Sequence, residues 1–435
     1  MKAMIMIRKL SSTTLKLNYK INSISNKFLS IIMLDSVILF LSGVPGIVLT
    51  SFLLFIDFSE EKIAVLISIA SLTQLSQILS TAIYRKFRNK KKVIFTLKFV
   101  RSISLLCIPI VPLVFDTSYY FLVILIFIFI RDFSQNLIGG GFVEWNDSYI
   151  TEERKGIYYG TRNVLHNGVF IVVSFIFGLI LDSYKSSYFI YILIFAFALL
   201  MTIFQWLVLS KVPYKIPDIK DELPLFKTMF LPLKDKHYRS FITFSILWSL
   251  SLSLGRPLLT IYSVKYLTYS YSMIATVASL TAFFKLFSGL YFGKIVDKKS
   301  SNHVIIIAGL GFAISNFAYI FMSSSLPVIY ILANVFNGIF MIGFNVAKFR
   351  LNLHLSKGIN MNAYLSMNVF FSGLTAFLSI YLSSFFIKWA KSIDIRVLTY
   401  TLNSYQVLFF ISGLFHLFAL YYFVRTLNKK ENINE

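Results

Sequence analysis

The sequence predicts an all-α polytopic membrane protein with twelve transmembrane helices in two pseudo-symmetric six-helix bundles. Three observations carry this prediction. Of the 435 residues, 57% are hydrophobic and only 14% are charged, whereas a typical soluble domain has about 25% charged residues. Apolar runs of roughly 20 residues, long enough to cross a bilayer as helices, recur along the chain. One long polar segment separates these runs into two equal sets.

The apolar runs are too long for the strands of about ten residues that build membrane β-barrels. Helices satisfy their own backbone hydrogen bonds in lipid, so a helical bundle is expected. The first six runs lie near 28–55, 62–84, 93–115, 119–140, 157–181 and 187–209. The second six lie near 240–264, 271–295, 303–322, 326–350, 362–388 and 403–425.

The long polar segment contains four prolines and charges of both signs, and we expect it to be a central loop between two domains. The expected organisation is a cytoplasmic tail at 1–27, a bundle at 28–209, a cytoplasmic central loop at 210–239, a second bundle at 240–425 and a cytoplasmic tail at 426–435. Because most other loops are short, we expect the function to lie within the bundles.

Basic residues predict the orientation. The 42 Lys and Arg outnumber the 19 Asp and Glu, which in a soluble protein suggests a nucleic-acid partner but in a membrane protein is typical of cytoplasmic loops. Segments 1–27, 85–92 and 210–239 are basic, whereas most loops of opposite parity are poor in positive charge. We therefore predict a cell (plasma) membrane protein with both termini cytoplasmic and no nucleic-acid partner. An organellar transit peptide is the alternative interpretation of the basic, Ser- and Thr-rich start.

The most specific motif lies between the eighth and ninth predicted helices and runs Gly293-Lys-Ile-Val-Asp297-Lys298-Lys299. A glycine there allows two helices to approach closely, and the charges can pair with neighbouring helix ends. The corresponding loop of the first half begins at Ser80 and contains Tyr84 and Phe87. The motif resembles the signature of the major facilitator superfamily, in which Gly, Asp and Gly stand where this loop has Ser80, Tyr84 and Phe87.

This resemblance implies two parallel repeats with a substrate site near the membrane midplane between them. Residues 145–163 also resemble the junction of the fourth and fifth helices in many bacterial members of the superfamily. We expect the charged loops to form a cytoplasmic gate, although solvated topology signals are the alternative. The expected gate residues are Arg85, Arg88, Glu144, Asp147, Arg154, Arg162, Gly293, Asp297 and Lys298.

Charges inside the bilayer are costly, so they are candidates for function. The superfamily plan implies that helices one, four, seven and ten line the cavity, and we expect Asp35 to meet Arg131 and Asp132 there. Arg131 and Gln135 resemble part of an antiporter motif on helix four. A carboxylate beside an arginine suits proton coupling, whereas a static ion pair that fixes helix packing is the alternative. Lys98 and Arg101 lie near a helix end and are expected to snorkel.

Further polar residues in the second half are expected to line the substrate cavity, although hydrogen bonds between helices would explain them equally well. These candidates are Trp248, Ser249, Ser253, Arg256, Lys285, Asn334 and Asn337. Trp145, Trp206 and Trp389 lie near helix ends, where tryptophan commonly anchors a helix at the membrane interface.

The sequence has no pattern for an enzyme, a metal site or a cofactor. The single cysteine, Cys107, excludes a disulfide framework. His166 and His416 are isolated, and no His, Cys, Asp or Glu spacing suits a metal. There is no Walker A loop for ATP and no protease or hydrolase motif. The proline-containing antiporter motif that the superfamily carries on helix five is also missing.

These observations predict a secondary active transporter that works by rocker-switch alternating access and is coupled to a proton or another ion. Deep cations outnumber acids, which favours a small anionic or amphipathic solute, including a peptide or an antimicrobial compound. Efflux is favoured, and a nutrient uptake symporter is an alternative. A non-transporting membrane protein on a degenerate transporter scaffold and an intramembrane enzyme are others. We expect a monomer in the lipid bilayer.

Overall fold

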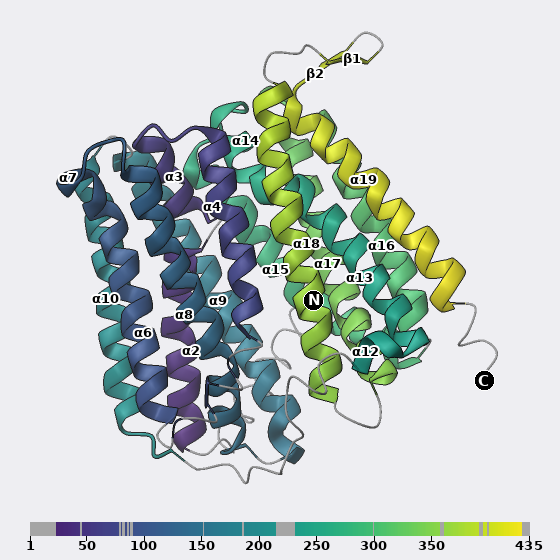
Figure 1. Ribbon diagram of the computed structural model, residues 1–435, viewed down its shortest axis with the longest axis horizontal. Coiled ribbons are helices and arrows are strands. Elements are labelled where there is room, and N and C mark those ends of the chain that lie inside the picture. The colour runs from purple at the N-terminus through teal and green to yellow at the C-terminus, as the bar shows by residue number, and fades with distance from the viewer. Residues whose placement is uncertain are drawn as a thin grey trace, which may run out of the picture.

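The computed structural model forms two helical bundles side by side, one from each half of the chain (Figure 1). The structure describes residues 23–43, 46–77, 80, 83–84, 87, 90–150, 152–184, 187–214, 231–298, 300–356, 361–390, 395–397 and 400–428. Within these ranges, 23–24, 140, 144, 152–156, 297–298, 361–363, 395–397, 400–401 and 428 are described by their backbone alone.

Long helices make up the N-terminal half. They are α2 (Ser23–Ser42), α3 (Ile47–Phe55), α4 (Glu60–Leu72), α6 (Lys90–Cys107), α7 (Val111–Val114), α8 (Tyr120–Asp147), α9 (Glu152–Tyr184) and α10 (Tyr188–Ser210), with 3-10 turns η1 (Thr73–Leu75) and η2 (Ile108–Ile110). The first predicted helix is interrupted between α2 and α3, beside Gly43 and Gly46.

The C-terminal half repeats the plan. Its helices are α12 (Leu231–Lys234), α13 (Lys236–Leu254), α14 (Leu259–Lys265), α15 (Tyr271–Lys298), α16 (Ser301–Ala318), α17 (Pro327–Leu355), α18 (Met361–Ala390) and α19 (Ser404–Phe423). Short elements are the 3-10 turns η3 (Arg256–Leu258) and η4 (Tyr319–Phe321), the π-helical turn η5 (Val424–Asn428), and the antiparallel strands β1 (Ile395–Val397) and β2 (Tyr400–Leu402). This hairpin was not predicted.

The predicted fold class is confirmed. Over the described residues, eleven helices are long and apolar enough to cross a membrane. The remaining predicted span, near 62–84, contains α4, which passes into the 3-10 turn η1 after Leu72, and part of this range lies outside the described residues.

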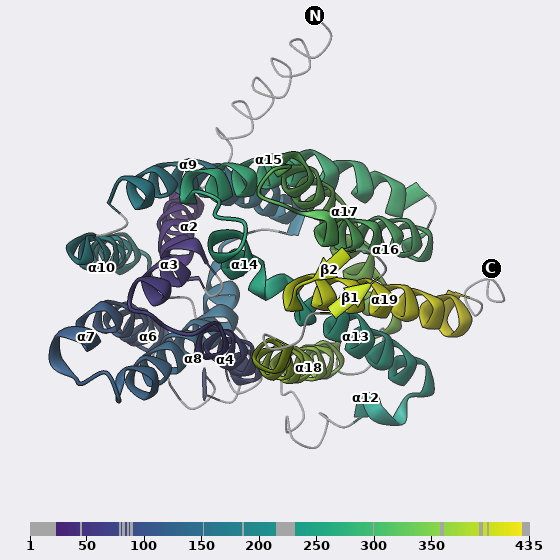
Figure 2. The same cartoon turned by 90° about the horizontal axis from the view of Figure 1, so that it is seen from above.

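The halves meet along two long helix pairs, α9 with α15 and α4 with α18, which Figure 2 shows side by side on opposite edges of the molecule. We call the end that holds Glu60 and Lys265 the outer end, and the end that holds Lys90 and Lys236 the inner end, following the predicted orientation.

The buried core differs between these ends. Towards the outer end, one apolar cluster joins both halves and includes Phe52, Tyr191, Tyr262 and Tyr405. Towards the inner end there are two separate clusters, one around Phe28 and Trp145 in the N-terminal half and one around Trp248 and Phe344 in the C-terminal half. Within the described residues, the apolar core that the two halves share therefore lies towards the outer end.

Candidate functional site

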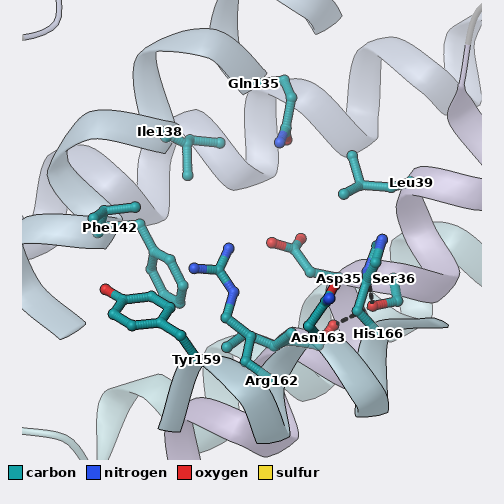
Figure 3. Close-up of a pocket in the computed structure, with 13 residues that line it drawn as sticks. Asp35, Ser36, Leu39, Gln135, Ile138, Phe142, Tyr159, Arg162, Asn163 and His166 are labelled. Carbon is teal, nitrogen blue, oxygen red and sulfur yellow. Dashed lines mark hydrogen bonds between the residues drawn. The ribbon is translucent and has the colours of Figure 1, made fainter. Parts of the chain in front are cut away.

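A cavity of about 460 Å³ lies in the inner half of the N-terminal bundle, between α2, α8 and α9. Figure 3 shows Asp35, Arg162 and His166 directed into the same space. The lining residues are Ile32, Asp35, Ser36, Leu39, Gln135, Ile138, Gly139, Phe142, Val143, Tyr159, Arg162, Asn163 and His166. We call this space the N-half cavity.

Asp35 is the centre of a buried ion cluster at the wall of this cavity. Its carboxylate lies 3.3 Å from Lys98 Nζ and 2.9 Å from Arg101 Nη1, both on α6. Arg101 also donates to Gln135 on α8 at 2.6 Å, and Lys98 donates to Gln205 on α10 at 3.1 Å. The cluster links four helices through groups that lipid cannot solvate.

The prediction that Lys98 and Arg101 snorkel is wrong. Their side chains are only 3% and 1% exposed. Both point inward because Asp35 supplies the negative charge that offsets their removal from water. The contacts of Lys98 and Arg101 were not predicted, because the position of a residue along one helix does not reveal a partner on another helix. The available signal was the three-residue spacing of two cations on one helix face.

The predicted meeting of Asp35 with Arg131 and Asp132 is also wrong. Arg131 pairs with the adjacent Asp132 at 2.6 Å and donates to the carbonyl of Ser42 at the end of α2. Helices present unsatisfied carbonyls and partial negative charge at this terminus, so a cation there is stabilising. These contacts agree with the alternative that Arg131 and Asp132 form a static ion pair that fixes helix packing.

His166 and Arg162 reach the N-half cavity from α9. His166 Nδ1 lies 2.6 Å from the hydroxyl of Ser36, one residue after Asp35. The guanidinium of Arg162 lies 5.7 Å from the centre of the Tyr159 ring. The structure therefore places Arg162 in a cavity wall, whereas the sequence placed it in the gate. His166 was dismissed as isolated, because its partner lies 130 positions away.

A second cavity, of about 490 Å³, lies mainly in the C-terminal half. We call it the C-half cavity. Its walls come from α13, η3, α17 and α18, with α4 and η1 of the other half at its edge. The lining residues are Ile67, Ser71, Gln74, Trp248, Ser249, Leu252, Ser253, Arg256, Pro257, Met341, Phe344, Asn345, Lys348, Ser372, Ala376 and Ile380.

Four predicted residues line this cavity together. Trp248 is stacked on Phe344 with ring centres 3.6 Å apart, and Ser249 donates to the Ser372 carbonyl at 2.6 Å. Arg256 lies 5.6 Å from the Phe312 ring centre and 3.3 Å from the sulfur of Met341. Ser253 is the fourth. Lys348 was missed, since it lies near the predicted end of its helix.

The other three candidates from the second half of the sequence line none of the cavities described here. Lys285 packs beside Gly338 of α17. Asn334 donates to the Tyr330 carbonyl at 2.8 Å and accepts from Tyr319 at 3.3 Å. Asn337 is fully buried, and neither polar atom of its amide has a hydrogen-bond partner among the described residues.

Most of the predicted gate lies outside the described residues or side chains, namely Arg85, Arg88, Glu144, Arg154, Asp297 and Lys298. Asp147 accepts a hydrogen bond from Tyr159 of its own half. Gly293 does not mediate a close helix approach, because a Cβ there would meet nothing within 4 Å. In the first half, the Tyr84 ring occupies the space that a Cβ at Gly141 would need.

Only two of the three predicted interfacial tryptophans are exposed. Trp206 and Trp389 are 42% and 61% exposed. Trp145 is fully buried and donates to the Pro213 carbonyl at 3.1 Å. Trp145 therefore links the inner end of the N-terminal core to the chain that follows α10.

Polar contacts join the two halves at the outer end. The buried carboxylate of Glu60, at the start of α4, lies 2.7 Å from Lys265 and accepts from Tyr405 at 2.7 Å and from Tyr266 at 3.2 Å. Burial and the Glu60 charge raise the pKa of Tyr266 above its usual range. We call these four residues the outer latch, which the sequence did not predict.

A second polar contact lies nearby, where Asp182 of α9 accepts from the backbone nitrogens of Tyr271 and Ser272 at 2.7 and 2.8 Å. This carboxylate satisfies donors at the start of α15, where helices favour negative charge. A separate apolar cavity of about 330 Å³ is lined by both halves, including Leu39, Phe170 and Ala275.

Comparison with known proteins agrees with this geometry. The sequence model of the Major Facilitator Superfamily matches residues 240–435. This match covers the C-terminal half of the chain. No match was found among curated protein sequences. The chain is a multi-pass membrane protein, with eleven helices among its described residues that are long and apolar enough to cross a membrane.

Solved structures of several transporters share the fold at low sequence identity. The nucleoside transporter NupG is 14% identical with a TM-score of 0.69, over 93% of this chain and 99% of that one. The D-xylose-proton symporter is 14% identical with a TM-score of 0.67, over 96% and 98%. A bacterial homologue of the iron transporter ferroportin is also 14% identical, over 92% and 98%, with a TM-score of 0.66 in its inward-facing state and 0.58 in its outward-facing state.

Proposed function

We propose that this protein is a secondary active transporter that moves a small anionic or amphipathic solute across the cell membrane by alternating access. The observation that carries the proposal is the pair of polar cavities, one in each half, in the inner part of a bundle whose halves are joined at the outer end. Solute sites of such transporters lie near the membrane midplane between two repeats.

We infer that the structure is an inward-facing state, with both termini cytoplasmic. The shared core and the outer latch support a closed outer end, and the separate inner cores support an open inner end. The higher TM-score to the inward-facing than to the outward-facing ferroportin homologue agrees.

We further propose that protons drive transport through Asp35 and His166, which meet at the N-half cavity. Asp35 faces Lys98 and Arg101 on α6, Gln135 on α8 and Gln205 on α10, and it shares the cavity with His166 and Arg162 of α9. Histidine changes charge near neutral pH. A proton on either residue changes the balance of charge between α2 and α9.

Liposomes test transport and coupling together. The purified protein is reconstituted, a pH gradient is imposed, and pools of metabolites, peptides and dyes are screened for flux. We expect gradient-driven flux of an anionic solute, which Asp35→Asn abolishes and His166→Gln makes insensitive to pH between about 5 and 8. Asp132→Asn is the matched control, because it removes a half-buried carboxylate that lines neither polar cavity. Flux unchanged by both test variants contradicts the coupling proposal.

Efflux is the direction we propose, from the resemblance of Arg131 and Gln135 to an antiporter motif, and nutrient uptake is the alternative. The single cysteine makes orientation accessible to experiment. In a Cys107→Ser background, an impermeant thiol reagent added outside cells should label Thr268→Cys and not Lys211→Cys, because both positions are exposed at opposite ends. Flux in vesicles oriented by this assay then gives the direction.

A second candidate function, a non-transporting protein on a transporter scaffold, is favoured by one observation. In the first-half motif, Tyr84 stands in place of the superfamily's Asp and packs on Gly141. A folded, monodisperse protein that moves no solute from any pool would support this candidate and contradict transport.

A further inference from the structure

The C-terminal half has almost no negative charge to balance its deep cations. Between residues 236 and 428 the sequence has only two acids, Asp297 and Asp394. Asp297 lies one residue before the inner end of α15, and Asp394 lies outside the described residues. Among the described residues, Arg256, Lys285 and Lys348 form no ion pair, and no carboxylate lines the cavity that holds Arg256 and Lys348.

Arg256 and Lys348 lie in the same cavity wall. Arg256 follows the end of α13, and Lys348 lies two turns before the end of α17. Among the described residues, neither has a carboxylate within ion-pair distance. Arg256 instead contacts a thioether and an aromatic ring, which are weak partners for a guanidinium. By contrast, Lys98, Arg101 and Arg131 of the other half each contact a carboxylate.

The rest of the cavity is suited to a small polar solute. Its volume of about 490 Å³ falls within the usual range of about 300–1,000 Å³ for ligand pockets. Ser253 and Asn345 supply hydrogen-bonding groups, and the Trp248 ring stacked on Phe344 supplies an apolar wall. Ser71 and Gln74 of the N-terminal half lie at the edge, so a bound solute contacts both halves.

We propose that Arg256 and Lys348 bind the doubly charged anionic group of the transported solute, a phosphate monoester or a dicarboxylate. Arginine binds such groups through two parallel hydrogen bonds, and lysine adds a mobile point charge. Lys285 lies on the neighbouring α15 and adds to the positive potential without lining the cavity. This inference rests on the proposed function and specifies its substrate class.

Binding to the purified full-length protein tests the inference without requiring transport. Isothermal titration at low ionic strength compares glycerol 3-phosphate, inorganic phosphate and succinate with uncharged glycerol. We expect binding of at least one doubly charged anion, weakened by salt because it is electrostatic. Preference for the phosphates or for succinate identifies the anionic group. No binding of any anion overturns the proposal.

Variants locate the site. Arg256→Gln and Lys348→Gln should each weaken binding at least tenfold, whereas Arg256→Lys and Lys348→Arg should restore part of it. Lys388→Gln is the matched control, since it removes an exposed cation at the outer end of α18. Size-exclusion profiles verify that each variant is folded. Equal affinity in folded Arg256→Gln and Lys348→Gln proteins overturns the site.

The two proposals fail in different ways. Anion binding without flux in liposomes contradicts transport and leaves the anion site supported. Flux restricted to uncharged or cationic solutes, with no anion binding, contradicts the anion site and leaves transport supported.

Discussion

The two halves share one helical plan but differ in how they accommodate buried cations. In the N-terminal half, Lys98 and Arg101 surround Asp35, so their charge is offset by the protein itself. In the C-terminal half, Arg256 and Lys348 line a cavity with no carboxylate. A buried cation with a built-in partner holds helices together, whereas one without a partner is available to a solute. The comparison thus separates structural charge from binding charge within one fold.

The largest expected effect is on stability, when one charge is removed from the ion cluster of the N-terminal half and one from the cavity of the C-terminal half. Asp35→Asn leaves two buried cations without a carboxylate and should destabilise the protein by about 3–5 kcal/mol. Arg256→Met removes a charge that has no carboxylate, so stability should be unchanged or increased. Thermal unfolding of both variants in the same detergent measures the contrast. Equal loss of stability would remove the distinction between the halves.

The outer latch tests whether the halves separate at the outer end. Glu60→Gln removes the ion pair with Lys265 and weakens the hydrogen bonds from Tyr405 and Tyr266, so it should favour outer opening by about 1–3 kcal/mol. In a Cys107→Ser background, a cysteine at Thr260, in the wall of the apolar cavity between the halves, should then react faster with an impermeant thiol reagent.

Asp116→Asn is the control for this latch, because it changes an exposed acid at the outer end, between α7 and α8. Labelling at Thr260→Cys that is equally fast with and without Glu60→Gln would show that the latch does not hold the outer end closed.

A smaller effect distinguishes the two copies of the loop motif. Gly293→Ala places a methyl group in open space within a helix, so it should be neutral or stabilise by about 0.5–1 kcal/mol. Gly141→Ala places the same methyl group against the Tyr84 ring and should destabilise by about 1–3 kcal/mol. Thermal unfolding of the two variants gives the comparison, and the double variant Gly141→Ala/Tyr84→Ala should recover part of the loss. No recovery would show that the Tyr84 contact is not the cause.

Sequence reasoning succeeded where a property depends on neighbouring positions along the chain. Apolar runs predicted the membrane-spanning helices, because hydrophobic length is a local quantity. Trp248, Ser249, Ser253 and Arg256 line one cavity and lie close together in the sequence, on α13 and the turn η3 that follows it. Sequence reasoning failed for Lys98, His166 and Glu60, whose partners lie on other helices.

The amino-acid sequence by itself determined that this protein crosses a membrane as two helical bundles, because burying so many apolar residues in water-free surroundings leaves few other solutions. Only the tertiary structure decided which charges neutralise each other and which are left for a solute. Pairing depends on how helices distant in sequence are rotated and placed, and over a few ångströms in a low-dielectric interior that placement changes a charge from a structural contact into a binding group.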